Sequence, residues 1–132
     1  KVDFRIIVSS IQFLPIGHGW ESWNNFPHER KKLIKMIDKA DLNQILFISG
    51  DRHRGGIYKF KTDKDKVISE VTSSSLNASF PNKEEYGPLR IGKTFIEENY
   101  GLIYFDSENN DMFVDLKNVN GEVVRNITIS NE

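Results

Sequence analysis

The sequence contains no cysteine, which excludes a disulfide framework, thiol catalysis and cysteine-ligated zinc. It also has no excess of charge of one sign, since 18 Lys and Arg stand against 19 Asp and Glu, for a formal net charge of -1. The strongly basic field typical of nucleic-acid-binding proteins is absent, so we expect no nucleic-acid-binding surface. No apolar run approaches the roughly 20 residues of a membrane-spanning helix, and we expect no membrane span.

What is present is typical of a folded domain. The chain has 132 residues, of which 38% are hydrophobic, and it includes 9 Phe, 4 Tyr and 2 Trp. This length and this aromatic content argue against disorder and allow one core. The first residue is Lys rather than Met, and a strand pattern begins almost at once. We therefore expect residues 1–132 to be a single domain or a fragment of a longer one.

The first 50 residues predict a strand, a helix and a second strand. Residues 4–9 are rich in β-branched side chains and predict a buried strand. A helix is expected over Pro27–Lys39, because proline suits the first helical turn and apolar residues then recur at helical spacing. Ile45–Ser49 is apolar on both faces, as a central covered strand should be. This order predicts a βαβ crossover with two parallel strands.

The remaining residues predict mainly antiparallel strands. Residues 57–61 and 67–72 are expected to form a hairpin, and the polar, turn-rich segment 73–93 is expected to be a loop. Three further strands are predicted, connected by hairpin turns, over residues 100–105, 112–116 and 123–129. The expected fold class is therefore mixed, β-rich α/β, with one βαβ unit followed by antiparallel strands.

The strongest candidate for a chemical site follows the central strand. Ligands of open α/β sheets gather beyond the carboxyl ends of the strands, where Asp51 and His53 lie. A carboxylate and a neutral imidazole together suit a divalent metal or Fe(III). Positions two apart in an extended backbone point to the same side, so both side chains are expected to reach one cavity. The alternative is an ordinary surface turn, which a lone Asp-x-His pattern taken by itself favours.

Further candidates lie in the long loop over residues 10–26 and beside His53. The loop is either pinned by its aromatic side chains or forms one wall of a pocket. Arg52 is either a solvated surface charge or a ligand for an anionic substrate such as a phosphate ester. The candidate pocket and substrate-binding residues are His18, Trp20, Glu21, Trp23, Arg30 and Arg52.

Several motifs occur in an order that resembles the C-terminal part of the alkaline phosphatase D family of metallophosphoesterases. The resemblance covers nearly the whole chain, and five ordered blocks make it more specific than any one motif. These blocks are residues 8–13, 20–30, 47–53, 70–77 and 97–103.

The resemblance implies a fold, an activity and a metal. It implies the C-terminal half of a calcineurin-like αββα sandwich and a metal-dependent phosphatase or phosphodiesterase. Asp51 and His53 match the family's late metal-site motif, and His53 would either bind metal or assist proton transfer as a catalytic residue. The metal would be Fe, Ca, Mn or Zn. Family members are often exported by bacteria, which suggests a periplasmic or secreted protein.

The resemblance also implies that part of the site is missing from this chain. The aspartates and the Asn-His motif that hold most of the family's metal cluster precede the region matched here. We therefore expect the isolated chain to be weakly active or inactive, and a split sandwich to expose an apolar face. The expected partners are a phosphate ester and either the N-terminal half of the same domain or a second copy of the chain. A non-catalytic binding or structural domain on the same scaffold is the alternative.

Overall fold

The N-terminal part of the chain forms a βαβ unit in the computed structural model, which describes residues 2–80 and 83–130. Its elements are strand β1 (Arg5–Val8), the 3-10 helix η1 (Trp23–Asn25), helix α1 (Pro27–Lys39) and strand β2 (Ile45–Ser49). Strands β1 and β2 pair in parallel, with Arg5 beside Ile45. The predicted crossover is confirmed, and helix α1 and strand β2 have the predicted bounds.

A five-stranded sheet grows from this unit in the order β1-β2-β4-β3-β5. Strands β3 (Gly55–Lys61) and β4 (Val67–Thr72) form the predicted antiparallel hairpin. Strand β4 also pairs in parallel with β2, with Ile68 beside Ile45. Three strands of this sheet are therefore parallel, one more than the βαβ unit alone predicts.

Strand β5 (Arg90–Phe95) is the part of the fold that the sequence prediction missed, since residues 73–93 were expected to be a loop. It pairs antiparallel with β3, with Ile57 beside Ile91 and an irregular register. Most of its side chains are exposed or half-buried, and Gly92 has a φ of +70°. An edge strand of this kind has no alternation of apolar and polar residues and therefore gives no period-2 signal.

The last three strands form a separate antiparallel sheet in the order β6-β7-β8. Their bounds are β6 (Asn99–Asp106), β7 (Asp111–Asn118) and β8 (Val123–Ser130), which extend the predicted strands by a few residues. The turns contain Asn110 at a φ of +55° and Gly121 at a φ of +80°. Asparagine and glycine tolerate this left-handed conformation, so the predicted hairpin turns are confirmed.

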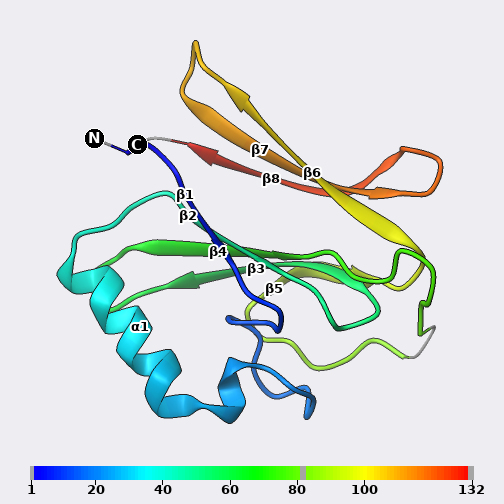
Figure 1. Ribbon diagram of the computed structural model, residues 1–132, viewed down its shortest axis with the longest axis horizontal. Helices are drawn as coiled ribbons and strands as arrows, with labels where there is room; N and C mark the ends of the chain where they lie inside the picture. Colours follow the sequence, from blue (N-terminus) through cyan, green and yellow to red (C-terminus); the bar gives the residue numbers. More distant parts are fainter. Residues whose placement is uncertain (1, 81–82, 131–132) are drawn as a thin grey trace.

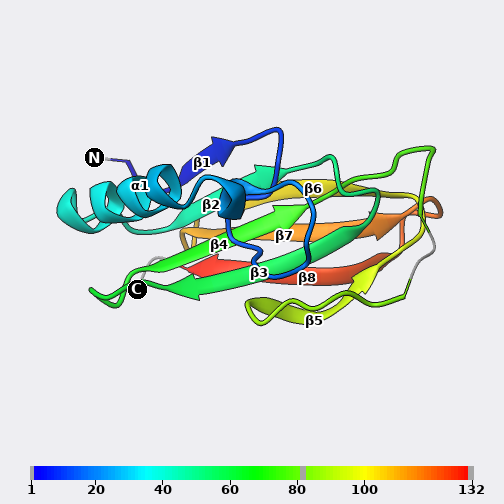
Figure 2. The same ribbon diagram turned by 90° about the horizontal axis from the view of Figure 1, so that it is seen from below.

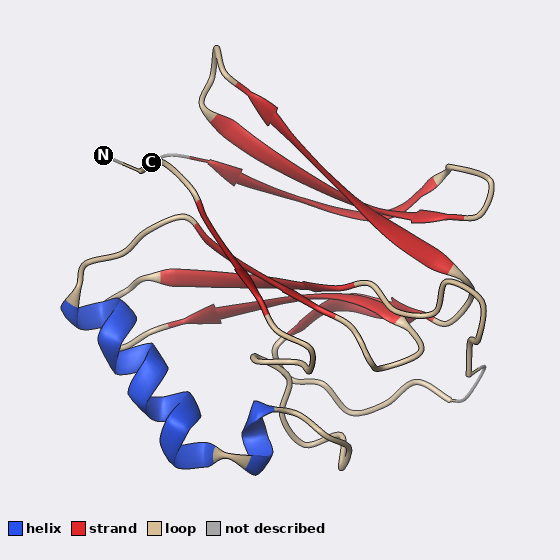
Figure 3. Ribbon diagram, in the orientation of Figure 1, coloured by secondary structure: helices blue, strands red, loops and turns tan. Residues whose placement is uncertain are grey.

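The described residues form three layers (Figures 1 and 3). Helix α1 covers one face of the five-stranded sheet and the three-stranded sheet covers the other. Strand β2 serves both cores, because Ile45 and Phe47 pack toward the helix while Leu46 packs toward the second sheet. Figure 2 shows β1 and β5 at opposite edges of the larger sheet. Over residues 2–80 and 83–130, no helix is long and apolar enough to cross a membrane.

Candidate functional site

The turn after β2 places the two predicted metal ligands. Asp51 and His53 both have a left-handed backbone, with φ values of +69° and +52°. The predicted extended backbone is therefore wrong at this point. Such conformations are uncommon for residues with a side chain and cluster at functional sites. Despite the different geometry, both side chains line the same cavity at the carboxyl end of β2.

This cavity has a volume of about 410 Å³. It brings together side chains from the loop before η1, from the turn after β2 and from the segment before β5. The lining residues are Trp20, Glu21, Asp51, Arg52, His53, Arg54 and Phe80. Five of the predicted site residues thus meet at one place. Phe80 was not predicted, because it lies in a polar, turn-rich segment whose pattern gives no sign of a pocket.

His53 is held on several sides. Its backbone N–H donates to Ser74 Oγ at 2.9 Å, and its ring stacks on Phe80 with centroids 4.1 Å and planes 7° apart. The ring nitrogen Nδ1 contacts the carbonyl oxygen of Ala78. Since a carbonyl only accepts, Nδ1 must carry a proton in this contact, and in the neutral ring the lone pair is then on Nε2. Metal-binding histidines are commonly oriented by such a hydrogen bond.

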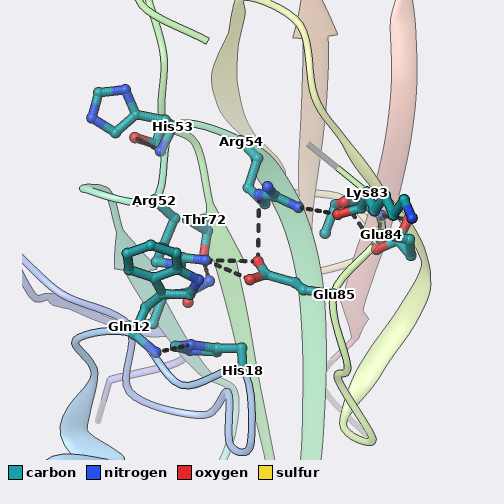
Figure 4. A network of polar contacts seen from close by, with 12 residues as sticks. Gln12, His18, Arg52, His53, Arg54, Thr72, Lys83, Glu84 and Glu85 are labelled. Atoms are coloured by element: carbon teal, nitrogen blue, oxygen red, sulfur yellow. Dashed lines mark hydrogen bonds and ion pairs between the residues drawn. The ribbon is translucent and has the colours of Figure 1, made fainter. Parts of the chain in front are cut away.

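An ion-pair cluster of Arg52, Arg54 and Glu85 lies next to the cavity (Figure 4). Arg52 donates to Glu85 Oε1 at 2.9 Å, and Arg54 Nε lies 3.4 Å from the same carboxylate. The three side chains are only 10%, 5% and 13% exposed, in the order Arg52, Arg54 and Glu85. Two guanidinium groups face one carboxylate, so the cluster keeps one positive charge in excess. Arg52 is therefore a buried ion-pair partner rather than a solvated surface charge.

His18 lies beside this cluster and does not line the cavity. Its Nδ1 accepts a hydrogen bond from the backbone N–H of Trp20 at 3.0 Å. Its Nε2 is buried and has no hydrogen-bond partner among the described residues. Burial, reinforced by the positive charge of Arg52, lowers the pKa of His18 below 6.5. The imidazole is thus kept neutral near the positive cluster.

Two predicted pocket residues lie elsewhere. Trp23 packs edge-on against Phe13 at 5.3 Å and donates from Nε1 to Ser9 Oγ at 3.0 Å. Arg30 donates to the backbone carbonyl oxygens of Phe13 and Leu14 at 2.9 and 3.1 Å. Both side chains hold the long loop against the sheet. The structure does not bring either of them to the cavity of Asp51 and His53.

A buried polar network, which the sequence analysis missed, also anchors the long loop over residues 10–26. The carboxylate of Glu70 on β4 is fully buried and accepts from the backbone N–H of Phe13 at 3.0 Å and from Ser49 Oγ at 2.6 Å. Burial raises the pKa of Glu70, although these donors and Arg30 oppose the shift. The signal was a glutamate in the middle of a predicted strand, where a buried charge must be paired.

The same network continues to Gln12 and Tyr58. Gln12 Nε2 donates to Thr72 Oγ1 at 2.8 Å and to the Tyr58 hydroxyl at 3.1 Å. Burial raises the pKa of Tyr58 to about 12. These contacts join the start of the loop to strands β3 and β4.

The donor set for a metal ion is partial. Asp51 and His53 have the right donor atoms, and the Nε2 lone pair of His53 suits a metal. However, residues 2–80 and 83–130 contain no group of three or more His, Cys, Asp and Glu side chains that could hold a metal. Asp51 and His53 would therefore hold a metal only together with further ligands.

The arrangement defines a class of protein: a mixed α/β domain with a polar and aromatic cavity beyond a central parallel strand. A comparison with protein families matches residues 4–127 to the PhoD-like phosphatases. The chain belongs to this family, which confirms the resemblance to alkaline phosphatase D. No curated protein matches the sequence.

Among solved structures, the chain is similar to one titled "GAP50 the anchor in the inner membrane complex of Plasmodium". The TM-score is 0.71 and the sequence identity 14%. The match covers 98% of this chain and 37% of that one. The likeness shows a shared fold, and the chain spans little more than a third of that protein's length.

Proposed function

We propose that this chain forms part of the active site of a metal-dependent phosphoesterase, which hydrolyses phosphate mono- or diesters. Its membership of the PhoD-like phosphatases supports phosphoester hydrolysis. The observation that carries the proposal for this chain is that Asp51 and His53 line one cavity at the carboxyl end of β2. This is where ligands of α/β sheets bind.

Asp51 and His53 would hold the metal, which is Fe, Ca, Mn or Zn. When bound, such a metal activates a water molecule and neutralises charge on the phosphate oxygens. The hydrogen bond from His53 Nδ1 to Ala78 and the stack on Phe80 fix the ring, so that only Nε2 is free to take part in the reaction. Its role is either metal binding or holding a proton near the leaving oxygen.

The other residues of the cavity would bind and shield the substrate. Arg52 and Arg54 keep one positive charge in excess of Glu85, and this charge together with the metal cation would balance Glu21 and Asp51 and favour an anionic ester. Trp20 would form an apolar wall that excludes water, and Glu21 would accept hydrogen bonds from the alcohol part. His18 stays neutral and holds the backbone N–H of Trp20, so it would position that wall.

The remaining ligands would come from the rest of the same domain, or from a second chain that supplies it. The chain matches only 37% of a solved structure of the same fold, which leaves room for a further half. Strands β1 and β6 are edge strands of their sheets among the described residues, and they lie on one side of the sandwich, where Phe4 contacts Phe105. The further half would extend both sheets there and complete an αββα sandwich. A periplasmic or secreted location is part of this proposal.

The proposal is tested by metal content and hydrolysis together. The complete product of the reading frame that encodes these residues is purified without chelators, and its metals are measured by inductively coupled plasma mass spectrometry. We expect bound metal and hydrolysis of p-nitrophenyl phosphate or bis-p-nitrophenyl phosphate. Asp51→Asn and His53→Ala should reduce both by at least about tenfold. Asp63→Asn and His28→Ala are matched controls, because both residues are exposed and lie outside the cavity.

Two results would overturn the proposal. One is hydrolysis that persists in both Asp51→Asn and His53→Ala. The other is a folded complete protein that holds no metal and hydrolyses neither ester, which would leave a non-catalytic domain on the same scaffold. The 132-residue chain alone should give weak metal binding and little turnover, because it supplies only two of the ligands.

A further inference from the structure

Two aromatic side chains of the cavity are largely exposed. Trp20 is 61% exposed and Phe80 is 53% exposed, whereas the aromatic rings of the main core, Phe13, Phe47 and Tyr58, are at most 2% exposed. They come from chain segments 60 residues apart and line one cavity of about 410 Å³. Cavities of this size bury small molecules, and their aromatic walls supply most of the contact area. An exposed pair of rings at one cavity is therefore a candidate recognition element.

Each ring is already backed by a planar side chain of the site. The guanidinium of Arg52 lies 5.5 Å from the centroid of the Trp20 ring, and Glu85 holds that guanidinium in place. The Phe80 ring stacks on the imidazole of His53, and the backbone N–H of Phe80 donates to the His53 carbonyl oxygen at 3.3 Å. Both rings are thus ordered before a ligand arrives, which lowers the entropic cost of stacking a further ring on them.

The polar groups of the cavity limit the chemistry of its ligand. Glu21 supplies a carboxylate, which only accepts hydrogen bonds when ionised. Its natural partners are the hydroxyl groups of a sugar and the amino groups of a base. Arg52 and Arg54 retain one positive charge in excess over Glu85, which suits an anionic group once the metal of the proposed function offsets the carboxylates of the cavity. Aromatic walls, hydrogen-bond acceptors and a positive edge together match a nucleoside phosphate.

We propose that this cavity selects phosphate esters of nucleosides, with the base stacked on Trp20 or Phe80. The phosphate part of this inference rests on the proposed function, whereas recognition of the base depends on the two aromatic rings alone. Stacking on an aromatic side chain tolerates any base, because every base has a π face. The selection is therefore for a planar ring beside the phosphate rather than for one base.

The experiment compares ligands that differ only in the base. Dissociation constants of AMP and ribose 5-phosphate are measured by NMR titration of the labelled protein with diamagnetic Ca²⁺ present, and adenosine and ribose are compared without metal. We expect AMP to bind at least about tenfold more tightly than ribose 5-phosphate, and adenosine more tightly than ribose. In at least one of Trp20→Leu and Phe80→Leu, which keep apolar bulk without a flat ring, the ratio within each pair should fall toward one.

Phe26→Leu is the matched control, because its ring is 58% exposed but lines a separate depression beside Trp23. The ratios should stay unchanged in this variant. Equal binding of AMP and ribose 5-phosphate by the unaltered protein would overturn the inference and leave the proposed function standing. If neither phosphate binds but adenosine still binds more tightly than ribose, the proposed function fails and base recognition holds. A preference that survives in both leucine variants would also overturn the inference.

Discussion

The hydroxyl of Ser49 donates a 2.6 Å hydrogen bond to the carboxylate of Glu70, and the same carboxylate anchors the long loop through the backbone N–H of Phe13. Ser49 is the last residue of β2 and immediately precedes the turn with Asp51 and His53. Glu70 also accepts from the backbone N–H groups of Phe13 and Leu14. One buried carboxylate therefore ties the turn that carries the predicted metal ligands to the loop that carries Trp20.

Replacing this carboxylate should destabilise the whole protein. In Glu70→Gln, the new amide N–H group would face the donors of Phe13, Leu14 and Ser49, so buried donors would lose their acceptor. We expect the free energy of unfolding to fall by about 2–4 kcal/mol, as for other broken buried charged networks. Urea unfolding followed by circular dichroism measures the change. Glu108→Gln is the control, since Glu108 is exposed in the β6–β7 turn; an equal loss in both variants would contradict the prediction.

The neutral state of His18 should make stability depend on pH. Its pKa is lowered in the folded protein by burial and by Arg52, so the unfolded chain binds a proton at a higher pH than the folded one. The contribution of His18 to stability is therefore complete above pH 6.5 and is lost progressively as the pH falls through the lowered folded value.

This dependence is measured as the difference in unfolding free energy between the protein and His18→Gln from pH 8 to pH 5. Glutamine does not titrate in this range, so the unaltered protein should lose stability on acidification relative to the variant. His28→Gln, on the exposed face of α1, is the comparison for loss of a histidine. If the difference in unfolding free energy between the protein and His18→Gln stays constant over this range, folding does not shift the pKa of His18.

The ion pair at Glu85 gives a further prediction. In Glu85→Gln, the guanidinium groups of Arg52 and Arg54 would remain mostly buried without their counter-charge. We expect the free energy of unfolding to fall by about 1–3 kcal/mol, because an unpaired buried charge costs more than a surface pair contributes. High salt should partly restore the stability of this variant by screening the two charges. Thermal unfolding at low and high salt tests this, and a variant as stable as the original protein would contradict it.

Much of the fold follows from local patterns in the sequence. Helix α1 was predicted with its observed bounds because Pro27 marks its first turn and its apolar residues recur at helical spacing. Strand β2 was predicted because its residues are apolar on both faces, and the structure buries most of them. The parallel pairing of β4 with β2 was not predicted, since it joins residues far apart and leaves no local signature.

Part of the candidate site could also be predicted from local patterns in the sequence. Asp51 and His53 were found because they follow a recognisable strand, even though their left-handed backbone was not foreseen. Trp20 and Trp23 have the same chemistry and lie in the same loop, yet one lines the cavity and the other packs on Phe13. Tertiary contacts determine which of the two tryptophans lines the cavity, and the composition of the loop does not reveal it. Glu70 and Phe80 gain their roles only through partners distant in the sequence.

The last prediction concerns the side of the sandwich where β1 and β6 end their sheets. Phe4, just before β1, packs between the sheets. Ile6 and Val8 follow at every second position, so their side chains point to the same side as Phe4. The second sheet leaves these two residues uncovered, since Ile6 is 41% and Val8 77% exposed. Phe105 of β6, which contacts Phe4, is 55% exposed. Apolar residues on an uncovered inner face, next to edge strands, favour association.

A preparation of the 132-residue chain alone should therefore self-associate through this side. In analytical ultracentrifugation, we expect the average mass to rise with protein concentration. The double variant Val8→Lys, Phe105→Lys should remain monomeric, because burying two ammonium groups would oppose the contact. Val119→Lys is the matched control, since Val119 is 71% exposed in the β7–β8 turn and should not affect association. A chain that stays monomeric at high concentration would show that this side needs no partner, and would remove one support for a missing half of the domain.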